Sequence, residues 1–229
     1  MRNRDLKWMV WVIISLSLVV AQPKWSVSLG SGYYNPSLIG LDADTNTVLP
    51  NAGTFNKNIL LNWGLQYQFY PNARLGFSTF YSFHSGKIEG GDSDFSRLIR
   101  YRLLSLETFF FLRKRMELNF TLAPMWNKAT ISLKSTGSND DWNQLLASYD
   151  IESKDLDSQG KMVKRWFGFT SMIGFKYYLY SWLSIDTKIG FMRNFYKAEN
   201  WKVDGKKEKG PEMNIDKLPV YHLNFVFGW

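Results

Sequence analysis

Apolar and polar residues alternate along most of this chain, and the alternation is clearest between Asn58 and Tyr70. The apolar or aromatic members of that stretch occupy every second position and are Ile59, Leu61, Trp63, Leu65, Tyr67 and Phe69. The residues between them are mostly Asn, Gly and Gln, with Leu60 as the exception. A period of two indicates a β-strand with one apolar face and one polar face. The last nine residues repeat the pattern and end on Trp229.

The same period predicts eight strands. They cover 25–34, 58–70, 74–84, 98–112, 117–133, 164–180, 183–196 and 221–229. Short turns follow the second, fourth and sixth strands, whereas the links at 35–57, 85–97, 134–163 and 197–217 are long. Each strand reaches the roughly 9–11 residues that cross a bilayer at a tilt. The predicted fold class is therefore all-β: an eight-stranded, antiparallel, up-and-down transmembrane β-barrel with short periplasmic turns and long extracellular loops.

One proline falls inside a predicted strand. Pro124 lies in the strand expected over 117–133. Proline has no backbone N–H and cannot donate a hydrogen bond to a neighbouring strand. We therefore expect a local bulge at this position.

Aromatic residues gather near the predicted strand ends. On the turn side they are Trp25, Tyr70, Tyr180, Trp182 and Trp229, and on the loop side they are Tyr33, Tyr101, Trp126, Phe195 and Tyr221. Two aromatic belts of this kind mark the interfaces of a membrane. The other strand face carries mainly small uncharged residues, which suit the narrow interior of an eight-stranded barrel. A soluble barrel or sandwich gives the same period, but the belts and the terminal aromatic residue favour a membrane barrel.

The start of the chain predicts export. The basic residues Arg2, Arg4 and Lys7 precede an apolar run over 8–20, and a small-residue cleavage motif ends at Ala21. The run of 13 residues is shorter than the about 20 that a membrane-spanning helix needs. This pattern is typical of a Sec-type signal peptide. The predicted division is a cleaved signal peptide over 1–21 and an outer-membrane β-barrel domain over 22–229.

Composition adds little chemistry. The chain has no cysteine, which leaves out disulfides and thiol chemistry. Its net charge is +8. In an exported protein this excess does not indicate nucleic acid; it suits either solvated lysines in loops or a surface rich in lipid phosphates.

Six charged residues are predicted to point into the barrel. They are Arg74, Glu107, Glu117, Lys176, Asp186 and Lys188. Lys176 and Asp186 should lie opposite each other across the tight turn that follows Tyr180, so we expect a cross-strand ion pair. Such charges either gate a pore or plug a barrel too narrow to conduct, and eight strands favour the plug.

The C-terminal strand resembles that of bacterial outer-membrane barrels. In those proteins the barrel-assembly machinery reads alternating hydrophobic residues and a final aromatic residue, a pattern that matches Tyr221, Leu223, Phe225, Phe227 and Trp229. The whole chain after residue 21 is similar to the small eight-stranded proteins of the OmpX, OmpA-barrel and OmpW kind. The resemblance implies an integral outer-membrane location, contact with outer-membrane lipid and lipopolysaccharide, and insertion by that machinery. Because strands one and eight must close the barrel, Trp229 should lie near Trp25.

No motif identifies a catalytic residue, a metal site or a cofactor. Ser82 and His84 share a strand face, but no third group at a defined spacing completes a nucleophilic site. The acidic residues within 140–157 lack the spacing of a calcium-binding loop. We therefore expect no enzyme activity, no metal and no cofactor.

Four functions stay open at this level. The leading hypothesis is a non-enzymatic protein that binds an external ligand through its extracellular loops or stabilises the envelope. The alternatives are a narrow channel for small or hydrophobic solutes, a lipid-modifying enzyme, and a subunit of a secretion complex. The sequence does not identify the extracellular ligand.

Overall fold

The computed structural model describes residues 24–34, 37–38, 59–87, 94–134, 161–203, 205–208, 210 and 213–229. The expected signal peptide over 1–21 and the acidic stretch over 140–157 lie outside the described residues. Within the described ranges, no helix is long and apolar enough to cross a membrane.

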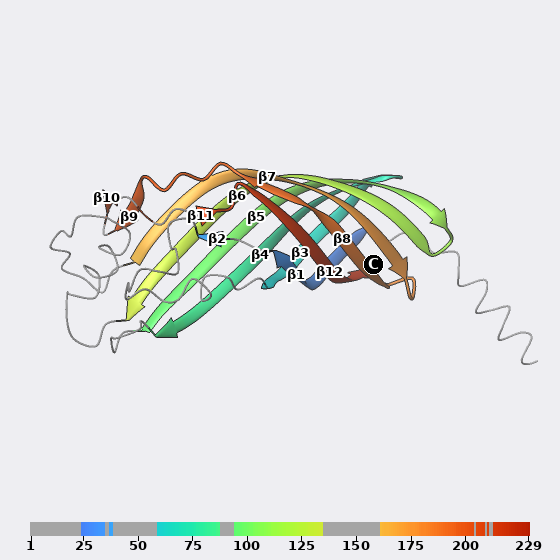
Figure 1. Ribbon diagram of the computed structural model, residues 1–229. Coiled ribbons are helices and arrows are strands. Elements are labelled where there is room, and N and C mark those ends of the chain that lie inside the picture. Colours follow the sequence, from blue (N-terminus) through green and yellow to red (C-terminus); the bar gives the residue numbers. More distant parts are fainter. Residues whose placement is uncertain are drawn as a thin grey trace, which may run out of the picture.

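Eight long strands form a closed antiparallel barrel (Figure 1). They are β1 (Trp25–Tyr34), β3 (Ile59–Tyr70), β4 (Ala73–Lys87), β5 (Asp94–Arg113), β6 (Met116–Lys134), β7 (Lys161–Tyr178), β8 (Leu183–Asn194) and β12 (Lys217–Gly228). Each strand pairs with its neighbour in the chain, and β12 pairs with both β8 and β1, so the barrel wall has no free edge. This confirms the predicted all-β fold, an eight-stranded antiparallel barrel.

The barrel closes between its first and last strands. The Trp25 amide donates a hydrogen bond of 3.2 Å to the Trp229 carbonyl, and the Trp229 amide donates one of 3.0 Å to the Trp25 carbonyl. The predicted proximity of these two residues is confirmed. Gly30 of β1 packs directly against β12, where a Cβ atom would strike the Leu223 carbonyl oxygen and the Asn224 Cα atom. The seam therefore needs a residue without a side chain at this position.

Four short strands gather at the end of the barrel that lies opposite the C-terminus (Figure 1). β2 (Ser37–Leu38) pairs with β11 (Met213–Asn214). β9 (Trp201–Val203) pairs with β10 (Lys206–Glu208) and also with the start of β7. The sequence pattern missed these strands, because segments of two or three residues are too short to show a period.

Several strands are longer than the sequence pattern predicted. β4 and β5 stay paired out to Lys87 and Asp94, inside the link expected over 85–97. Backbone pairing thus continues where the side-chain alternation has already ended. β5, β6 and β7 reach 20, 19 and 18 residues, about twice the 9–11 that cross a bilayer. Their outer parts therefore form a wall that projects beyond a bilayer.

Pro124 does not produce the expected bulge. On the β5 side, the ladder runs through Leu103–Met125, is interrupted, and resumes at Leu106–Leu122 with the register unchanged. The missing N–H of Pro124 thus breaks the ladder toward one neighbour without adding a residue to either strand. The register shifts lie instead at the turn ends, between Gln68 and Tyr70 and in β5 between Phe111 and Arg113.

The outer wall of the barrel is apolar. The outward side chains of Leu61 and Phe191 are more than 60% exposed, and most large apolar residues on the same alternate positions are exposed to a lesser extent. A continuous surface of this kind suits hydrocarbon and not water. Of the ten aromatic residues predicted for the two belts, nine are exposed: Trp25, Tyr33, Tyr70, Trp126, Tyr180, Trp182, Phe195, Tyr221 and Trp229. Tyr101, which was expected in the loop-side belt, is fully buried inside the barrel. Successive side chains of a strand point to opposite faces. Tyr101 is an odd number of positions from the outward Leu104 and Leu106, so its side chain points into the barrel.

Candidate functional site

The barrel interior is the candidate site, and it has three levels. A charged cluster lies near the short turns, a polar section lies in the middle, and apolar side chains fill the loop-side half. The charged cluster contains all six residues that the sequence predicted to face inward. They are Arg74, Glu107, Glu117, Lys176, Asp186 and Lys188, each at most 7% exposed.

Arg74 and Glu117 form the best-oriented pair of the cluster. Each lies one residue from the start of its strand, beside a short turn. The two terminal nitrogen atoms of Arg74 donate hydrogen bonds of 2.6 Å to the two carboxylate oxygen atoms of Glu117. The Tyr178 hydroxyl donates to Glu117 at 2.6 Å and accepts from Arg74 at 3.1 Å. The guanidinium carbon also lies 3.7 Å from the centre of the Phe109 ring. These contacts hold the guanidinium in one orientation.

Glu107 of β5 is the centre of the cluster. Its side chain is fully buried and contacts three cations: Arg74 at 2.8 Å, Lys176 at 3.7 Å, and Lys188 through a direct hydrogen bond. It also accepts hydrogen bonds from Gln66 at 3.3 Å and Thr121 at 3.1 Å. A single carboxylate therefore joins cationic groups from three different strands.

Lys176 and Asp186 are directly opposite in the β7–β8 register, as expected. Their ion pairs differ from the predicted one. Lys176 Nζ lies 3.6 Å from Glu117, whereas Asp186 pairs with Lys188 at 3.5 Å and accepts a hydrogen bond of 3.0 Å from Asn119. The lumen of an eight-stranded barrel is narrow enough for long side chains to reach across it. Residues across the lumen therefore compete with residues of the adjacent strand as ion-pair partners.

The cluster holds three cations and three carboxylates, so its formal charge is zero. The sequence pattern did not identify Tyr178 and Arg97 as interior residues. Tyr178 follows Lys176 by two positions, so the strand period alone places it in the cluster. Arg97 is buried and donates to Ser82 at 3.3 Å. It was missed because the strand was expected to begin at Leu98.

A small polar cavity lies between the charged cluster and the apolar half. Asn62, Asn224, His222 and Lys188 contribute to its lining, and its volume is about 40 Å³. The His222 ring stacks on Phe80 with a centroid separation of 4.5 Å. A volume of this size accommodates a few water molecules. It does not amount to a passage for solutes.

Apolar side chains fill the loop-side half of the lumen. Its fully or almost fully buried members include Tyr34, Leu60, Ile99, Tyr101, Leu103, Met125, Met162, Met192 and Trp201. The expectation of an interior of mainly small uncharged residues was therefore wrong for this half, which large apolar side chains fill. Close packing of apolar groups fills this half of the lumen.

The short strand β9 covers this apolar half, and we call residues Trp201–Val203 the β9 lid. Trp201 is fully buried, and its Nε1 donates a hydrogen bond of 2.9 Å to the Tyr196 hydroxyl. Gly210 packs against the indole ring, where a Cβ atom would clash. The fully buried Val203 is in register with Met162 of β7. The lid thus continues the barrel core at its outer end.

The remaining candidates for chemistry lie elsewhere. Ser82 is fully buried and accepts a hydrogen bond from Arg97, while the side chain of His84 lies outside the described residues. A larger hollow of about 570 Å³ lies on the outer wall, where the apolar residues Leu106, Phe120 and Ile173 contribute to its lining. Among the residues that the structure describes, no group of three or more potential ligands could hold a metal ion.

A closed eight-stranded barrel with an exposed apolar wall and a filled interior is the architecture of small bacterial outer-membrane β-barrels. Solved structures share this fold. One is a major outer membrane protein of Thermus thermophilus, with 8% identity and a TM-score of 0.53, where the match covers 90% of this chain and 99% of that chain. Another is Ail of Yersinia pestis in complex with a heparin analogue, with 11% identity, a TM-score of 0.50, and coverage of 91% and 99%.

No protein-family profile matches the chain, and no curated protein matches it. At 8–11% identity, the structural likeness assigns the fold alone. What the protein does must therefore be inferred from its own residues.

Proposed function

We propose that this protein is an integral outer-membrane barrel with a sealed lumen, which acts through the surface of its extracellular end and not as a channel or an enzyme. The filled interior carries the proposal. The charged cluster blocks the turn side, and the apolar side chains under the β9 lid block the loop side. A solute on either side would have to separate buried ion pairs or displace packed side chains, and both are costly.

The other features agree with a surface-binding or envelope-stabilising role. The long strands β5 to β7 carry the chain well beyond the length that a bilayer needs, so a large part of the protein stands outside the membrane. Ail, which shares the fold, was crystallised with the sulfated heparin analogue sucrose octasulfate. A barrel of this architecture can therefore present a surface that receives an external ligand.

The route to the membrane is part of the same proposal. Residues 1–21 would direct export and be removed. The terminal strand would then present Tyr221, Leu223, Phe225, Phe227 and Trp229 to the barrel-assembly machinery. All of these side chains are exposed except that of Phe227, which is half-buried. In the membrane, the apolar wall would contact outer-membrane lipid and lipopolysaccharide.

Single cysteines test the location and the orientation, because the chain has none of its own. Lys207→Cys places a thiol in β10 at the outer end, and Lys114→Cys places one in the turn between β5 and β6. On intact cells, a membrane-impermeant maleimide is expected to label Lys207→Cys. Lys114→Cys should react only after the outer membrane has been permeabilised.

The two variants control for each other, since both positions are exposed lysines. Labelling of Lys114→Cys alone on intact cells would show the reverse orientation. Labelling of neither variant before permeabilisation, with both reacting afterwards, would place the protein away from the cell surface and overturn the proposal.

A further inference from the structure

Three cationic side chains lie next to one another on the outer wall. Arg100 of β5 is in register with Lys128 of β6, and Lys128 is in register with Arg165 of β7. Their chain neighbours Tyr101, Ala129 and Trp166 are buried inside the barrel, so the alternation of a strand turns these three side chains outward. We call Arg100, Lys128 and Arg165 the basic row.

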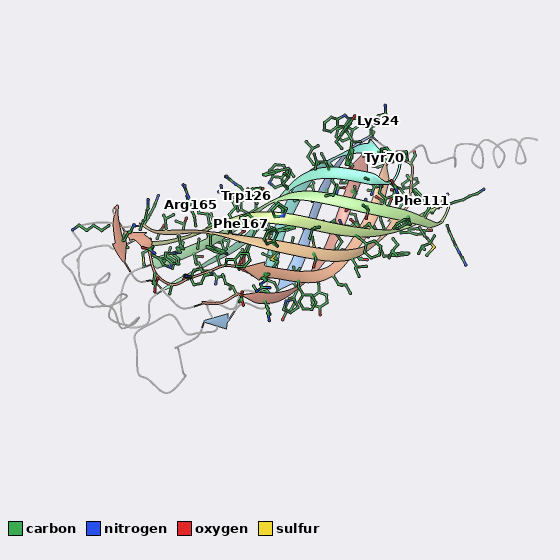
Figure 2. All side chains as sticks on the ribbon, turned by 90° about the horizontal axis from the view of Figure 1, so that it is seen from above. Lys24, Tyr70, Phe111, Trp126, Arg165 and Phe167 are labelled. Atoms are coloured by element: carbon green, nitrogen blue, oxygen red, sulfur yellow. The ribbon has the colours of Figure 1, made fainter. Side chains whose placement is uncertain are left out.

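The basic row stands one step beyond an aromatic belt. On the same outward face, two residues closer to the turns, Trp126 and Phe167 pack with their ring centroids 6.0 Å apart. Phe195 stacks on Phe167 at 6.4 Å. Figure 2 shows Arg165 beside Trp126 and Phe167, on the loop side of both, with Tyr70 and Phe111 at the opposite end of the barrel. Aromatic belts lie at the boundary between hydrocarbon and headgroups. The basic row therefore lies at the level of the lipid phosphates.

The basic row has no counter-charge in the part of the chain that the structure describes. The ion pairs between described residues join members of the interior cluster, and none of them involves the basic row. Like charges on directly opposed strand positions destabilise a sheet. Arg100 is held against the Tyr81 ring at 5.3 Å, and its Nε has no hydrogen-bond partner. Arg102, which is in register with Trp126, is exposed and adds a fourth cation to the outer wall. The charges of the interior cluster are thus balanced by one another, whereas the charges of the basic row have no such partner among the described residues.

We propose that the basic row binds the phosphate groups of an anionic lipid in the outer leaflet. Neighbouring strands lie about 4.8 Å apart, so the row presents cations over roughly 10 Å, a width that suits a headgroup with one or two phosphates. The two guanidinium groups can each donate two hydrogen bonds to one phosphate. The acyl chains of the same lipid would then lie on Trp126, Phe167 and the apolar wall below them. This inference rests on the proposed membrane location but not on the sealed lumen.

Lipid titration followed by native mass spectrometry tests the proposal. The full-length mature barrel, folded in detergent, is titrated with diphosphoryl lipid A and with lipid A from which both phosphates have been removed. The test variant is Arg100→Gln/Lys128→Gln/Arg165→Gln. The matched control is Arg113→Gln/Lys114→Gln/Arg115→Gln, which removes the same charge at the turn between β5 and β6. Heat-dependent mobility on a denaturing gel shows that each variant is folded.

Charges near a lipid surface each contribute about 1 kcal/mol, so the loss of three is expected to weaken binding of diphosphoryl lipid A on the order of 100-fold. The turn variant should bind like the unmodified barrel, and the dephosphorylated lipid should bind all three proteins equally weakly. Equal affinity of the row variant and the turn variant would overturn the proposal. So would equal binding of the two lipids, or displacement of the lipid by inorganic phosphate at the same concentration.

Lipid binding by the basic row and closure of the lumen can be tested separately. A barrel that conducts ions but still needs the basic row for lipid binding would contradict the sealed lumen and leave this inference intact. A barrel that does not conduct ions and binds lipid A equally well without the basic row would support the sealed lumen and overturn this inference.

Discussion

Replacing Glu107 by Gln is expected to destabilise the folded barrel by about 3–5 kcal/mol, the range measured when one partner of a buried ion pair is removed. Glu107 is fully buried and contacts Arg74, Lys176 and Lys188. Its loss leaves three buried cations facing two carboxylates. Urea titration in lipid vesicles, followed by tryptophan fluorescence and by the gel mobility of the folded form, measures the free energy of unfolding.

Two variants give this measurement its control and its rescue. Glu199→Gln removes the same charge from an exposed side chain and should change stability by less than about 0.5 kcal/mol. Adding Lys188→Met to Glu107→Gln makes the charged cluster neutral again, so part of the lost stability should return. A loss below about 1 kcal/mol for Glu107→Gln would show that the cluster is hydrated like a surface pair. In that case the charged cluster would not block the lumen.

Replacing Trp201 by Ala is expected to release the β9 lid. The Trp201 side chain is fully buried, and truncation of such a residue costs about 3–5 kcal/mol. Only two register pairs, Met162–Val203 and Val163–Lys202, join β9 to β7. The loss should therefore appear as local opening before global unfolding. Hydrogen exchange measured by mass spectrometry should show faster exchange of the amides in β9 and β10, with little change in β5 and β6.

Trp201→Phe separates the hydrogen bond from the packing. It removes the bond from Nε1 to the Tyr196 hydroxyl and keeps most of the apolar volume, so it should cost only about 1 kcal/mol. If Trp201→Ala leaves exchange in β9 and β10 unchanged, the lid is not held by this side chain, and the account of the loop-side plug is wrong.

The outer face of the barrel was predictable from sequence because one simple rule governs it. Side chains that meet lipid must be apolar, so Leu61, Phe225 and similar residues recur at every second position. That period also placed the six charged residues on the opposite face, and a barrel of eight strands is narrow enough that they converge. Closure between Trp25 and Trp229 followed from the number and direction of the strands.

The predictions that were wrong concern positions where this rule does not apply. In the loop-side half, the inward Ile99 and Leu103 are apolar and alternate with the outward cations Arg100 and Arg102. The apolar face of the alternation therefore points inward there, the reverse of its direction on the lipid-facing wall. Tyr101 was assigned by its nearness to a strand end, although its strand parity pointed inward. The partner of Lys176 depends on which side chains lie across the lumen, and that follows from the three-dimensional shear of the barrel.

The measurement that tests the central claim most directly is the conductance of the purified mature barrel in a planar lipid bilayer, with a general porin as the positive control in the same chamber. The sealed lumen predicts a current no different from that of the bare membrane, at all applied voltages, after insertion has been verified by heat-dependent mobility of the recovered protein. Discrete, reproducible openings would contradict it. They would show that the charged cluster and the apolar side chains of the loop-side half separate to form a channel.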